Sequence, residues 1–349
     1  MTVEAGRALV NLRDFEQAAG ARLDPVYFDY FASGAQDEIT VAANESAFRR
    51  RPLIPRVLRG CPSPRLETTV LGTPASMPVM IAPTAFHGLA CADGELATGR
   101  AAAAADITMI AAMLSTVTIE KIASTGAKLW FQLYIQPDLA FTKSLVRRAE
   151  EAGCRALVVT VDSPALGRNE RGDRNNFHDL PPGISCANMR GDGNVRQVVL
   201  SPEISWWHLD WLRETTALPI LLKGVLHADD ARIAVERGAD GLIVSNHGGR
   251  QLDTTPATLD RLPVIADAVA GRVPLLLDGG VRRGTDVAKA LALGAQAVGI
   301  GRPVLWGLAV AGEAGVAGVL EVLRAELVNA LTLLGVASPA ELTRDQAQP

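Results

Sequence analysis

The stretch VPLLLDGGVRRGTDVAKALALGAQAVGIGRP, residues 273–303, has two apolar runs separated by a segment with helical spacing. The runs are VPLLLDGG (273–280) and AVGIGRP (297–303). Between them, GTDVAKALALGA (284–295) repeats apolar residues at helical intervals and has a glycine near its end, which suits a helix C-terminus. A strand, a helix and a second strand in this order predict a parallel β-sheet.

The same alternation extends back along most of the chain. Helical spacing recurs in residues 140–153 and 227–239, between further short apolar runs. About eight βα units predict an α/β fold, a closed TIM (β/α)8 barrel that occupies residues 1–349 as a single domain. An open, doubly wound sheet stays as the alternative, because periodicity does not show closure. The further runs are VMIAPTAF (79–86), ITMIAAM (107–113), LWFQLYI (129–135), ALVVTVD (156–162), PILLKGV (219–225) and GLIVSNHG (241–248).

Two segments fall outside this repeat. Residues 1–52 read as a helical N-terminal lead that could cover one end of the barrel. Residues 178–207 lie between the fourth and fifth units and are rich in Pro, Gly and mixed polarity. Loops of this length in compact domains are usually functional, so we expect a lid over the active site.

The amino-acid composition limits the binding partners and the cellular compartment that we expect. The net charge is −4, with acidic and basic residues interspersed, so there is no basic stripe for nucleic acid and no polybasic membrane anchor. The four cysteines form no CxxC pair, which argues against a metal site and a disulfide framework. No signal peptide or uninterrupted membrane span stands out in the sequence. We expect a cytoplasmic protein with a small-molecule partner.

Polar residues follow the predicted strands. In a (β/α)8 barrel the active site lies at the C-terminal ends of the strands. We therefore expect these residues to converge on one site. They are Pro83, Thr84, Ala85, Gln132, Tyr134, Thr160, Asp162, Lys223, Ser245, Asn246, His247, Asp278, Gly279, Gly280, Gly301 and Arg302.

The last two units carry glycines and arginines after their strands. DGGVRRGTD (278–286) and GIGRPV (299–304) would expose backbone N–H groups and guanidinium groups where barrel enzymes commonly bind phosphate. Together the two loops predict a phosphorylated cofactor or substrate.

Two charged residues at strand ends have more than one interpretation. Lys223 ends an apolar strand, where a cation could form a structural ion pair, form a Schiff base or lie beside an electron-rich cofactor ring. Asp162 could orient a histidine and favour its protonated form, or merely cap the following turn.

His247 and Arg250 form the clearest catalytic combination. An imidazole titrates near neutral pH and can accept a proton, and an arginine nearby can bind a carboxylate through two hydrogen bonds. The combination suits proton removal from the α-carbon or the α-hydroxyl of a carboxylic acid. A structural histidine in a polar turn is the alternative.

With these residues assembled, the chain closely resembles the FMN-dependent α-hydroxy-acid oxidase and dehydrogenase family, which includes glycolate oxidase, lactate oxidase and mandelate dehydrogenase. The most specific match is SNHGGRQLD (245–253). It is accompanied by YFDYFASGAQDE (27–38), IAPTAF (81–86), FQLY (131–134), TVD (160–162) and LLKGV (221–225).

The resemblance implies a role for each site residue. His247 would be the catalytic base, Asp162 would pair with its imidazolium, and Tyr134 would bind the α-hydroxyl. Tyr30 and Arg250 would bind the substrate carboxylate, Arg168 would also bind the substrate, and Lys223 would lie beside N1 of the flavin. Pro83, Thr84, Ala85, Gln132, Thr160 and Ser245 would line the flavin ring and ribityl chain. The phosphate would lie on Asp278, Gly279, Gly280, Arg282, Gly301 and Arg302.

The reaction implied is oxidation of an (S)-2-hydroxy acid to the 2-oxo acid by FMN. Reoxidation by O2 would make the protein an oxidase that produces H2O2, and the lack of a haem domain before the barrel favours this. Transfer to a quinone or a carrier protein would make it a dehydrogenase, and an oxygenase outcome is also open. The resemblance further implies a homotetramer.

The sequence departs from the family pattern at two places. Asn169 stands where the family has a second substrate-holding arginine, with Arg168 one place earlier. Ala112 falls where a flavin-contacting serine is common, and Leu114 where glycolate-type enzymes carry a tryptophan. Less bulk at Leu114 predicts an aromatic substrate such as mandelate or 4-hydroxymandelate in preference to glycolate. A small aliphatic 2-hydroxy acid, lactate or glycolate, stays as the alternative.

Two hypotheses that assign the protein to other functional classes make different predictions. A lyase that uses Lys223 as a Schiff base would need no flavin and would purify colourless. A non-catalytic binder would keep its phosphate loops and could lose His247 or Arg250 without a change in ligand affinity.

Overall fold

Eight parallel strands form a closed barrel in the computed structural model, which describes residues 8–60, 63–191 and 194–348. This confirms the predicted TIM barrel and excludes the open sheet. Each strand is short and almost entirely buried, as expected for a parallel sheet covered by helices. The strands are β3 (Val79–Ile81), β4 (Thr108–Ala112), β5 (Lys128–Leu133), β6 (Leu157–Thr160), β9 (Ile220–Lys223), β10 (Gly241–Val244), β11 (Leu275–Asp278) and β12 (Ala297–Ile300).

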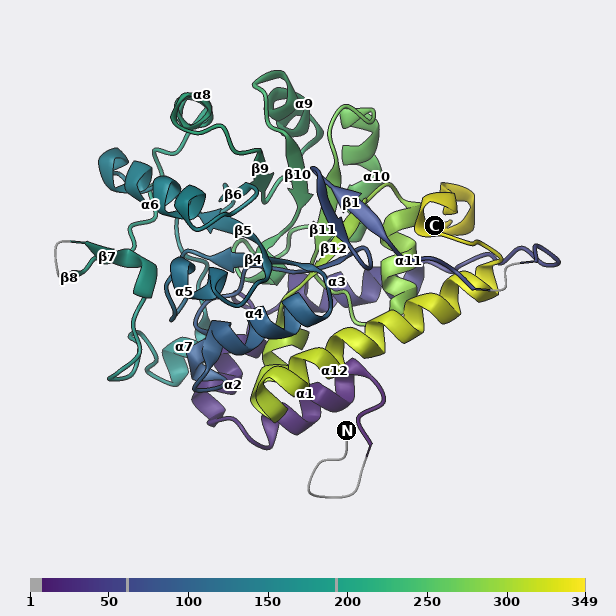
Figure 1. Cartoon of the computed structure of the whole chain (residues 1–349), viewed down its shortest axis with the longest axis horizontal. Helices are drawn as coiled ribbons and strands as arrows, with labels where there is room; N and C mark the ends of the chain where they lie inside the picture. The colour runs from purple at the N-terminus through teal and green to yellow at the C-terminus, as the bar shows by residue number, and fades with distance from the viewer. Residues whose placement is uncertain (1–7, 61–62, 192–193, 349) are drawn as a thin grey trace.

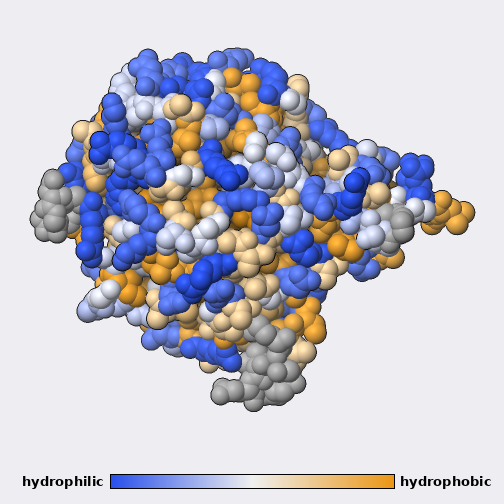
Figure 2. All heavy atoms as spheres, viewed as in Figure 1, coloured by the Kyte–Doolittle hydropathy of each residue, from blue (hydrophilic) through white to orange (hydrophobic). Residues whose placement is uncertain are grey.

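Helices follow every barrel strand and surround the sheet (Figure 1). Their apolar faces pack on the outside of the barrel and form the larger hydrophobic core. Hydrophilic residues are spread over the surface that Figure 2 shows. The helices are α4 (Gly94–Ala104), α5 (Ile119–Ala123), α6 (Leu139–Glu151), α8 (Trp206–Thr215), α9 (Ala228–Glu236), α10 (Thr258–Val269), α11 (Gly284–Ala292) and α12 (Arg302–Leu334).

A hairpin that the sequence analysis did not predict closes the barrel at the end opposite the site. Its strands are β1 (Thr68–Val70) and β2 (Thr73–Ala75). Val70 packs into the barrel interior beside Trp130, whose Nε1 donates a hydrogen bond of 3.3 Å to Thr73 Oγ1. Lys128, the first residue of β5, donates to the Pro74 carbonyl, which places the hairpin at the N-terminal ends of the strands.

The N-terminal lead contains α1 (Leu12–Gly20), α2 (Pro25–Ala32) and α3 (Ile39–Arg50), and its first seven residues lie outside the described residues. Asn11 caps α1 through its side chain, and Asp24 caps α2 ahead of Pro25. α1 packs along α12, whereas α3 contacts the η3 turn (His247–Gly249) at the site. The lead therefore supports both the barrel wall and the active-site loop.

The predicted lid loop, residues 178–207, contains short elements of its own. They are the η2 turn (Ala187–Met189) and the paired strands β7 (Arg190–Gly191) and β8 (Asn194–Val195), and residues 192–193 lie outside the described residues. The predicted end of the loop was two residues too late, because Ser205 is the N-cap of α8 and residues 206–207 are helical. A further helix, α7 (Glu170–Arg174), precedes the loop.

Among the described residues, α12 is the one helix long and apolar enough to cross a membrane by these two criteria. However, 61% of its most apolar stretch is buried within the structure. The helix packs on α1, α4 and α11, and its backbone departs from helical geometry at Ala311 and Gly312. Its apolar composition is therefore explained by packing in the core. Three short turns complete the described chain: η1 (His87–Leu89), η4 (Pro339–Glu341) and η5 (Arg344–Gln346).

Candidate active site

A cavity of about 1040 Å³ opens at the C-terminal ends of the barrel strands. It is large enough for a drug-sized cofactor together with a small substrate. Asp162, Thr160 and Ser245 are not in its lining and lie behind it, each hydrogen-bonded to a lining residue. The predicted site residues that line it are Tyr30, Pro83, Thr84, Ala85, Gln132, Tyr134, Arg168, Lys223, His247, Arg250, Asp278, Gly279, Gly280, Arg282, Gly301 and Arg302.

His247 has a left-handed backbone conformation with a φ of 58°. Residues other than glycine rarely adopt this conformation, so the surrounding contacts must hold it in place. The His247 N–H donates to Ser245 Oγ at 3.1 Å. Arg302 donates to the Gly248 carbonyl at 3.0 Å, and a Cβ on Gly249 would lie 2.7 Å from the Val41 nitrogen. The turn therefore depends on glycine at Gly249 and on contacts from two other elements.

The imidazole of His247 lies between a carboxylate and a phenol. Its Nδ1 is 3.0 Å from Asp162 Oδ1, and its Nε2 is 3.5 Å from the Tyr134 hydroxyl. Burial alone would raise the pKa of Asp162, but the charges and hydrogen bonds of His247, Lys223 and Ser163 outweigh it and hold that pKa below its usual value. An ionised Asp162 orients the ring through Nδ1 and leaves Nε2 directed toward the cavity.

Arg250 is held by the end of helix α2. Its NH1 donates to the Tyr30 carbonyl at 2.7 Å and to the Ser33 carbonyl at 3.1 Å. Carbonyls at a helix C-terminus lack partners within the helix and attract cations. The guanidinium also lies over the Tyr30 ring, 5.0 Å from its centroid. Burial raises the pKa of the Tyr30 phenol, which keeps it protonated as a hydrogen-bond donor.

Arg168 is not positioned as the resemblance implied. Its side chain is 73% exposed and pairs with Asp173 at 3.7 Å, so it lies at the outer mouth of the cavity. The neighbouring Asn169 accepts a hydrogen bond from the Gly172 N–H and caps α7. In this structure the loop turns the guanidinium of Arg168 toward Asp173, so that Arg168 binds substrate stays a prediction.

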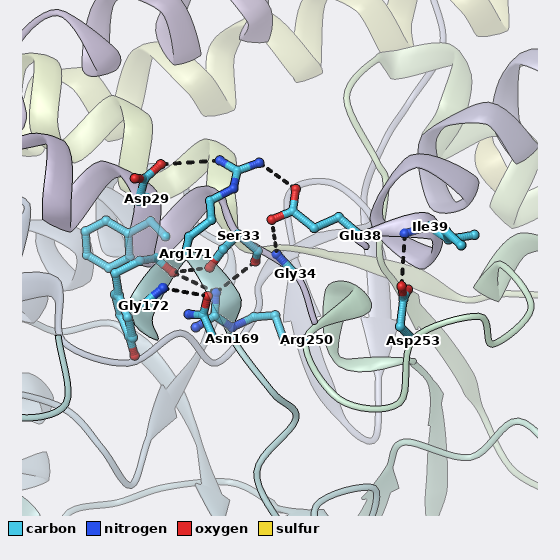
Figure 3. A network of polar contacts seen from close by, with 12 residues as sticks. Asp29, Ser33, Gly34, Glu38, Ile39, Asn169, Arg171, Gly172, Arg250 and Asp253 are labelled. Carbon is cyan, nitrogen blue, oxygen red and sulfur yellow. Dashed lines mark hydrogen bonds and ion pairs between the residues drawn. The ribbon is translucent and has the colours of Figure 1, made fainter. Parts of the chain in front are cut away.

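Arg171 does not replace the missing second arginine either. Figure 3 shows it extending between Asp29 and Glu38, with ion pairs of 3.4 and 2.5 Å. These contacts fasten α7 to α2 and to the N-terminus of α3. Arg250 is thus the guanidinium that α2 holds in position beside the base.

Lys223 forms an ion pair within the cavity wall. Its Nζ is 3.4 Å from Asp278 Oδ2 and donates to Ser245 Oγ at 3.1 Å, while Ser245 donates to Asp278 Oδ1 at 2.6 Å. Both oxygens of Asp278 therefore face this cluster. The resemblance implies that Asp278 contacts the phosphate. In this structure its carboxylate points at Lys223 instead, and its negative charge would repel a phosphate.

Arg282 and Arg302 lie close to Arg250, and Arg302 also contacts the turn that carries His247. Arg302 donates to the carbonyls of Phe31 and Ser33, and burial together with the charges of Arg250 and Arg282 lowers the pKa of Arg302 to about 9. Nε of Arg282 is buried and has no hydrogen-bond partner among the described residues. Arg282 pairs with Glu45 at 3.4 Å, and three guanidinium groups this close together favour a further anion beside them.

The known proteins that this chain resembles point to one family. The model of the family described as FMN-dependent dehydrogenase matches residues 19–349. The chain belongs to this family. It is 49% identical to the L-lactate oxidase of Nostoc sp. over 93% of this chain and 94% of the relative. It is 46% identical to the glycolate oxidase of Spinacia oleracea over 96% of this chain and 95% of the relative.

Solved structures agree with the sequence comparison. The crystal structure of mandelate oxidase with benzoyl-formic acid matches with a TM-score of 0.92 at 42% identity, covering 97% of this chain and 98% of that chain. A mandelate oxidase mutant with (S)-mandelic acid matches with the same TM-score and coverage at 43% identity. The family resemblance and the FMN cofactor predicted from the sequence are confirmed, and the protein is an FMN-dependent 2-hydroxy-acid oxidase.

The residues of this chain fit FMN. Arg282 and Arg302 would hold the phosphate, and the unpartnered Nε of Arg282 supplies a free donor for it. The backbone of Gly280 has a φ of 85°, and a Cβ there would lie 2.4 Å from the Asn44 carbonyl oxygen, so only glycine allows this close turn. Lys223 lies in the cavity wall, where its charge can stabilise an electron-rich ring.

We expect Arg282→Gln to weaken FMN binding by about 10- to 100-fold, because one charged hydrogen-bonding partner of the phosphate is lost. Fluorescence titration of the apoprotein with FMN measures the affinity. Arg283→Gln is the matched control, since Arg283 pairs with Glu326 at 2.6 Å and is 45% exposed. Equal losses in the two variants would contradict a specific phosphate contact from Arg282.

Sequence reasoning missed two buried polar pairs that support the site. Asn44 and Asn246 exchange amide hydrogen bonds of 2.9 and 2.8 Å across 202 positions of the chain. His87 Nε2 is 2.7 Å from Thr84 Oγ1, and burial lowers the pKa of His87, which favours a neutral ring. No local pattern marks either pair, because their partners meet only in the folded barrel or in an irregular turn.

Proposed function

We propose that this protein oxidises an aromatic (S)-2-hydroxy acid, such as mandelate or 4-hydroxymandelate, to the 2-oxo acid, and that O2 is the electron acceptor and is reduced to H2O2. The observation that carries the proposal is the convergence in one cavity of the His247 Nε2, the Tyr134 hydroxyl and the Arg250 guanidinium. An oriented base beside a cation suits the removal of a proton next to a carboxylate.

Each side chain has a defined task in this reaction. Arg250 and Tyr30 bind the substrate carboxylate, and Tyr134 binds the α-hydroxyl. Burial raises the pKa of Tyr134, so the phenol stays protonated. His247 Nε2 accepts the substrate proton, and the ionised Asp162 stabilises the imidazolium through Nδ1. FMN, when bound, supplies the two-electron acceptor.

The cavity wall supports an aromatic substrate. Leu114 and Ala112 both line the cavity, where neither presents a bulky ring. Tyr30, which also lines the cavity, packs against Phe86 and Phe177, with ring centroids 5.9 and 5.3 Å apart. A substrate ring could join this group edge to face. The 49% identity to an L-lactate oxidase favours a second candidate, a small aliphatic 2-hydroxy acid.

We expect kcat/KM to be higher for (S)-mandelate than for glycolate or L-lactate in an aerobic peroxide assay. We expect Leu114→Trp to lower kcat/KM for mandelate by about 10-fold or more while sparing glycolate, since an indole would fill the space that the substrate ring needs. Leu166→Trp is the control, because Leu166 is 83% exposed at the cavity mouth. A higher kcat/KM for glycolate or lactate in the parent enzyme would overturn the aromatic assignment.

A further inference from the structure

A chain of hydrogen bonds runs behind the His247–Asp162 pair. Asp162 Oδ1, which faces His247, also accepts a hydrogen bond from Ser163 Oγ at 3.0 Å. Ser163 in turn accepts from Gln251 Nε2, and Gln251 Oε1 accepts from the Gly167 N–H at 2.7 Å. Ser163 is buried, with 7% of its surface exposed. The chain therefore joins the loop after β6 to the partner of the base.

The direction of every donor in this chain is fixed by chemistry. A backbone N–H can only donate, so the oxygen of Gln251 must face Gly167 and its NH2 must face Ser163. Ser163 therefore accepts from Gln251, which turns its own proton toward another acceptor. The Tyr134 hydroxyl is also close to Ser163, but an ionised carboxylate is the stronger acceptor, so the proton goes to Asp162.

Close packing holds the far end of the chain in place. A Cβ on Gly167 would lie 2.2 Å from the Arg250 carbonyl oxygen and 2.6 Å from that of Gln251. Only glycine permits this approach, so the loop rests directly on the segment that carries Arg250. At the near end, Oδ2 of Asp162 is buried and has no hydrogen-bond partner among the described residues. Ser163 and His247 thus share the hydrogen bonding of this carboxylate, and both contact Oδ1.

We propose that Ser163, oriented by Gln251, is a positioning residue that sets the proton affinity of His247 through Asp162. The catalytic meaning of this inference rests on the proposed role of His247 as base. The hydrogen bond from Ser163 withdraws negative charge from the oxygen that faces the imidazole. Without that bond the carboxylate would stabilise the imidazolium more strongly, and His247 would hold its proton to a higher pH.

Other charged groups near His247 are not part of this chain and remain in the variants. Arg302 and Arg250 are cations that disfavour an imidazolium, and Lys223 acts on Asp162 in the same direction as Ser163. The groups that face the His247 region are Asp162 from the loop after β6, Tyr134 from the loop after β5, Lys223 from β9, Arg250 from the loop that carries His247 and Arg302 from α12.

The test is a direct titration of the ring in the FMN-loaded enzyme without substrate. The chain has five histidines, so 13Cε1-labelled histidine gives few NMR signals, and His247→Asn assigns the one of interest. In Ser163→Ala we expect the titration midpoint of His247 to rise by about half a pH unit or more. Ser163→Thr keeps the hydroxyl, so its His247 midpoint should equal that of the parent. Gln251→Met should raise the His247 midpoint, as Ser163→Ala does.

The control is Ser144→Ala, since Ser144 donates to the Phe141 carbonyl within α6, away from the site. A midpoint in Ser163→Ala that stays within about 0.2 units of the parent would overturn the proposal. The acid limb of kcat/KM against pH should move with the NMR midpoint. If the NMR midpoint moves and the acid limb does not, the effect of Ser163 on His247 stands, and the assignment of His247 as the base fails.

Discussion

Replacing His247 by Asn should lower the rate of flavin reduction by a 2-hydroxy acid by about 10³- to 10⁴-fold. General base catalysis contributes roughly this much, and an amide cannot accept the substrate proton. Asn is small enough to fit and polar enough to tolerate the contact with Asp162. Stopped-flow mixing without oxygen measures the rate, because the flavin absorbance falls as the cofactor is reduced.

The control for this variant is His227→Asn. His227 is 66% exposed and lies at the N-terminus of α9, away from the cavity, so we expect a rate within about twofold of the parent. The FMN content of both variants should equal that of the parent, since His227 is remote and the hydrogen bonds of the His247 ring go to Asp162 and Tyr134. A His247→Asn enzyme that reduces its flavin within about 10-fold of the parent rate would show that another group removes the proton.

Replacing Arg250 by Met should lower kcat/KM by about 10²- to 10³-fold. The substrate carboxylate would lose its charged partner in a largely desolvated site, and truncating one member of such a pair costs about 2–5 kcal/mol. Part of the loss would come from the Tyr30 and Ser33 carbonyls, which Arg250 now satisfies. The kcat/KM of Arg250→Lys should fall between those of the parent and Arg250→Met, because lysine keeps the charge but lacks the planar guanidinium that forms two hydrogen bonds.

Arg168→Met is the matched control for this prediction. Its guanidinium is exposed and paired with Asp173, so we expect kcat/KM to change by less than about threefold. Steady-state kinetics on both variants separates the two arginines. A larger loss at Arg168 than at Arg250 would mean that the loop rearranges to bring Arg168 onto the substrate.

The barrel was predictable because its evidence is local. Each strand is a short apolar run, each is followed by a helical segment, and the order of these elements allows few folds. The hairpin β1–β2 was missed because its strands have three residues each and give no periodic signal. The kink of α12 at Ala311 and Gly312 was missed because a glycine within a helical pattern does not by itself mark a kink.

Much of the site was also predictable, since strand ends bring His247, Asp162, Tyr134 and Lys223 to one edge of the barrel whatever the loops do. Loop residues were not predictable in this way. The direction of Arg168 depends on Asp173 and on the helix α7 that Asn169 caps. The carboxylate of Asp278 turns toward Lys223 because that cation lies buried beside it.

We propose that this enzyme uses FMN to oxidise an aromatic 2-hydroxy acid in the cavity at the strand ends. The most direct test mixes the yellow protein with (S)-mandelate without oxygen, follows the absorbance near ~450 nm, and then admits air. We predict rapid bleaching, followed by recovery of the colour with formation of H2O2 and benzoylformate. Bleaching without recovery in air would show that O2 is not the acceptor. A flavin that stays oxidised with mandelate would contradict the account of the substrate site.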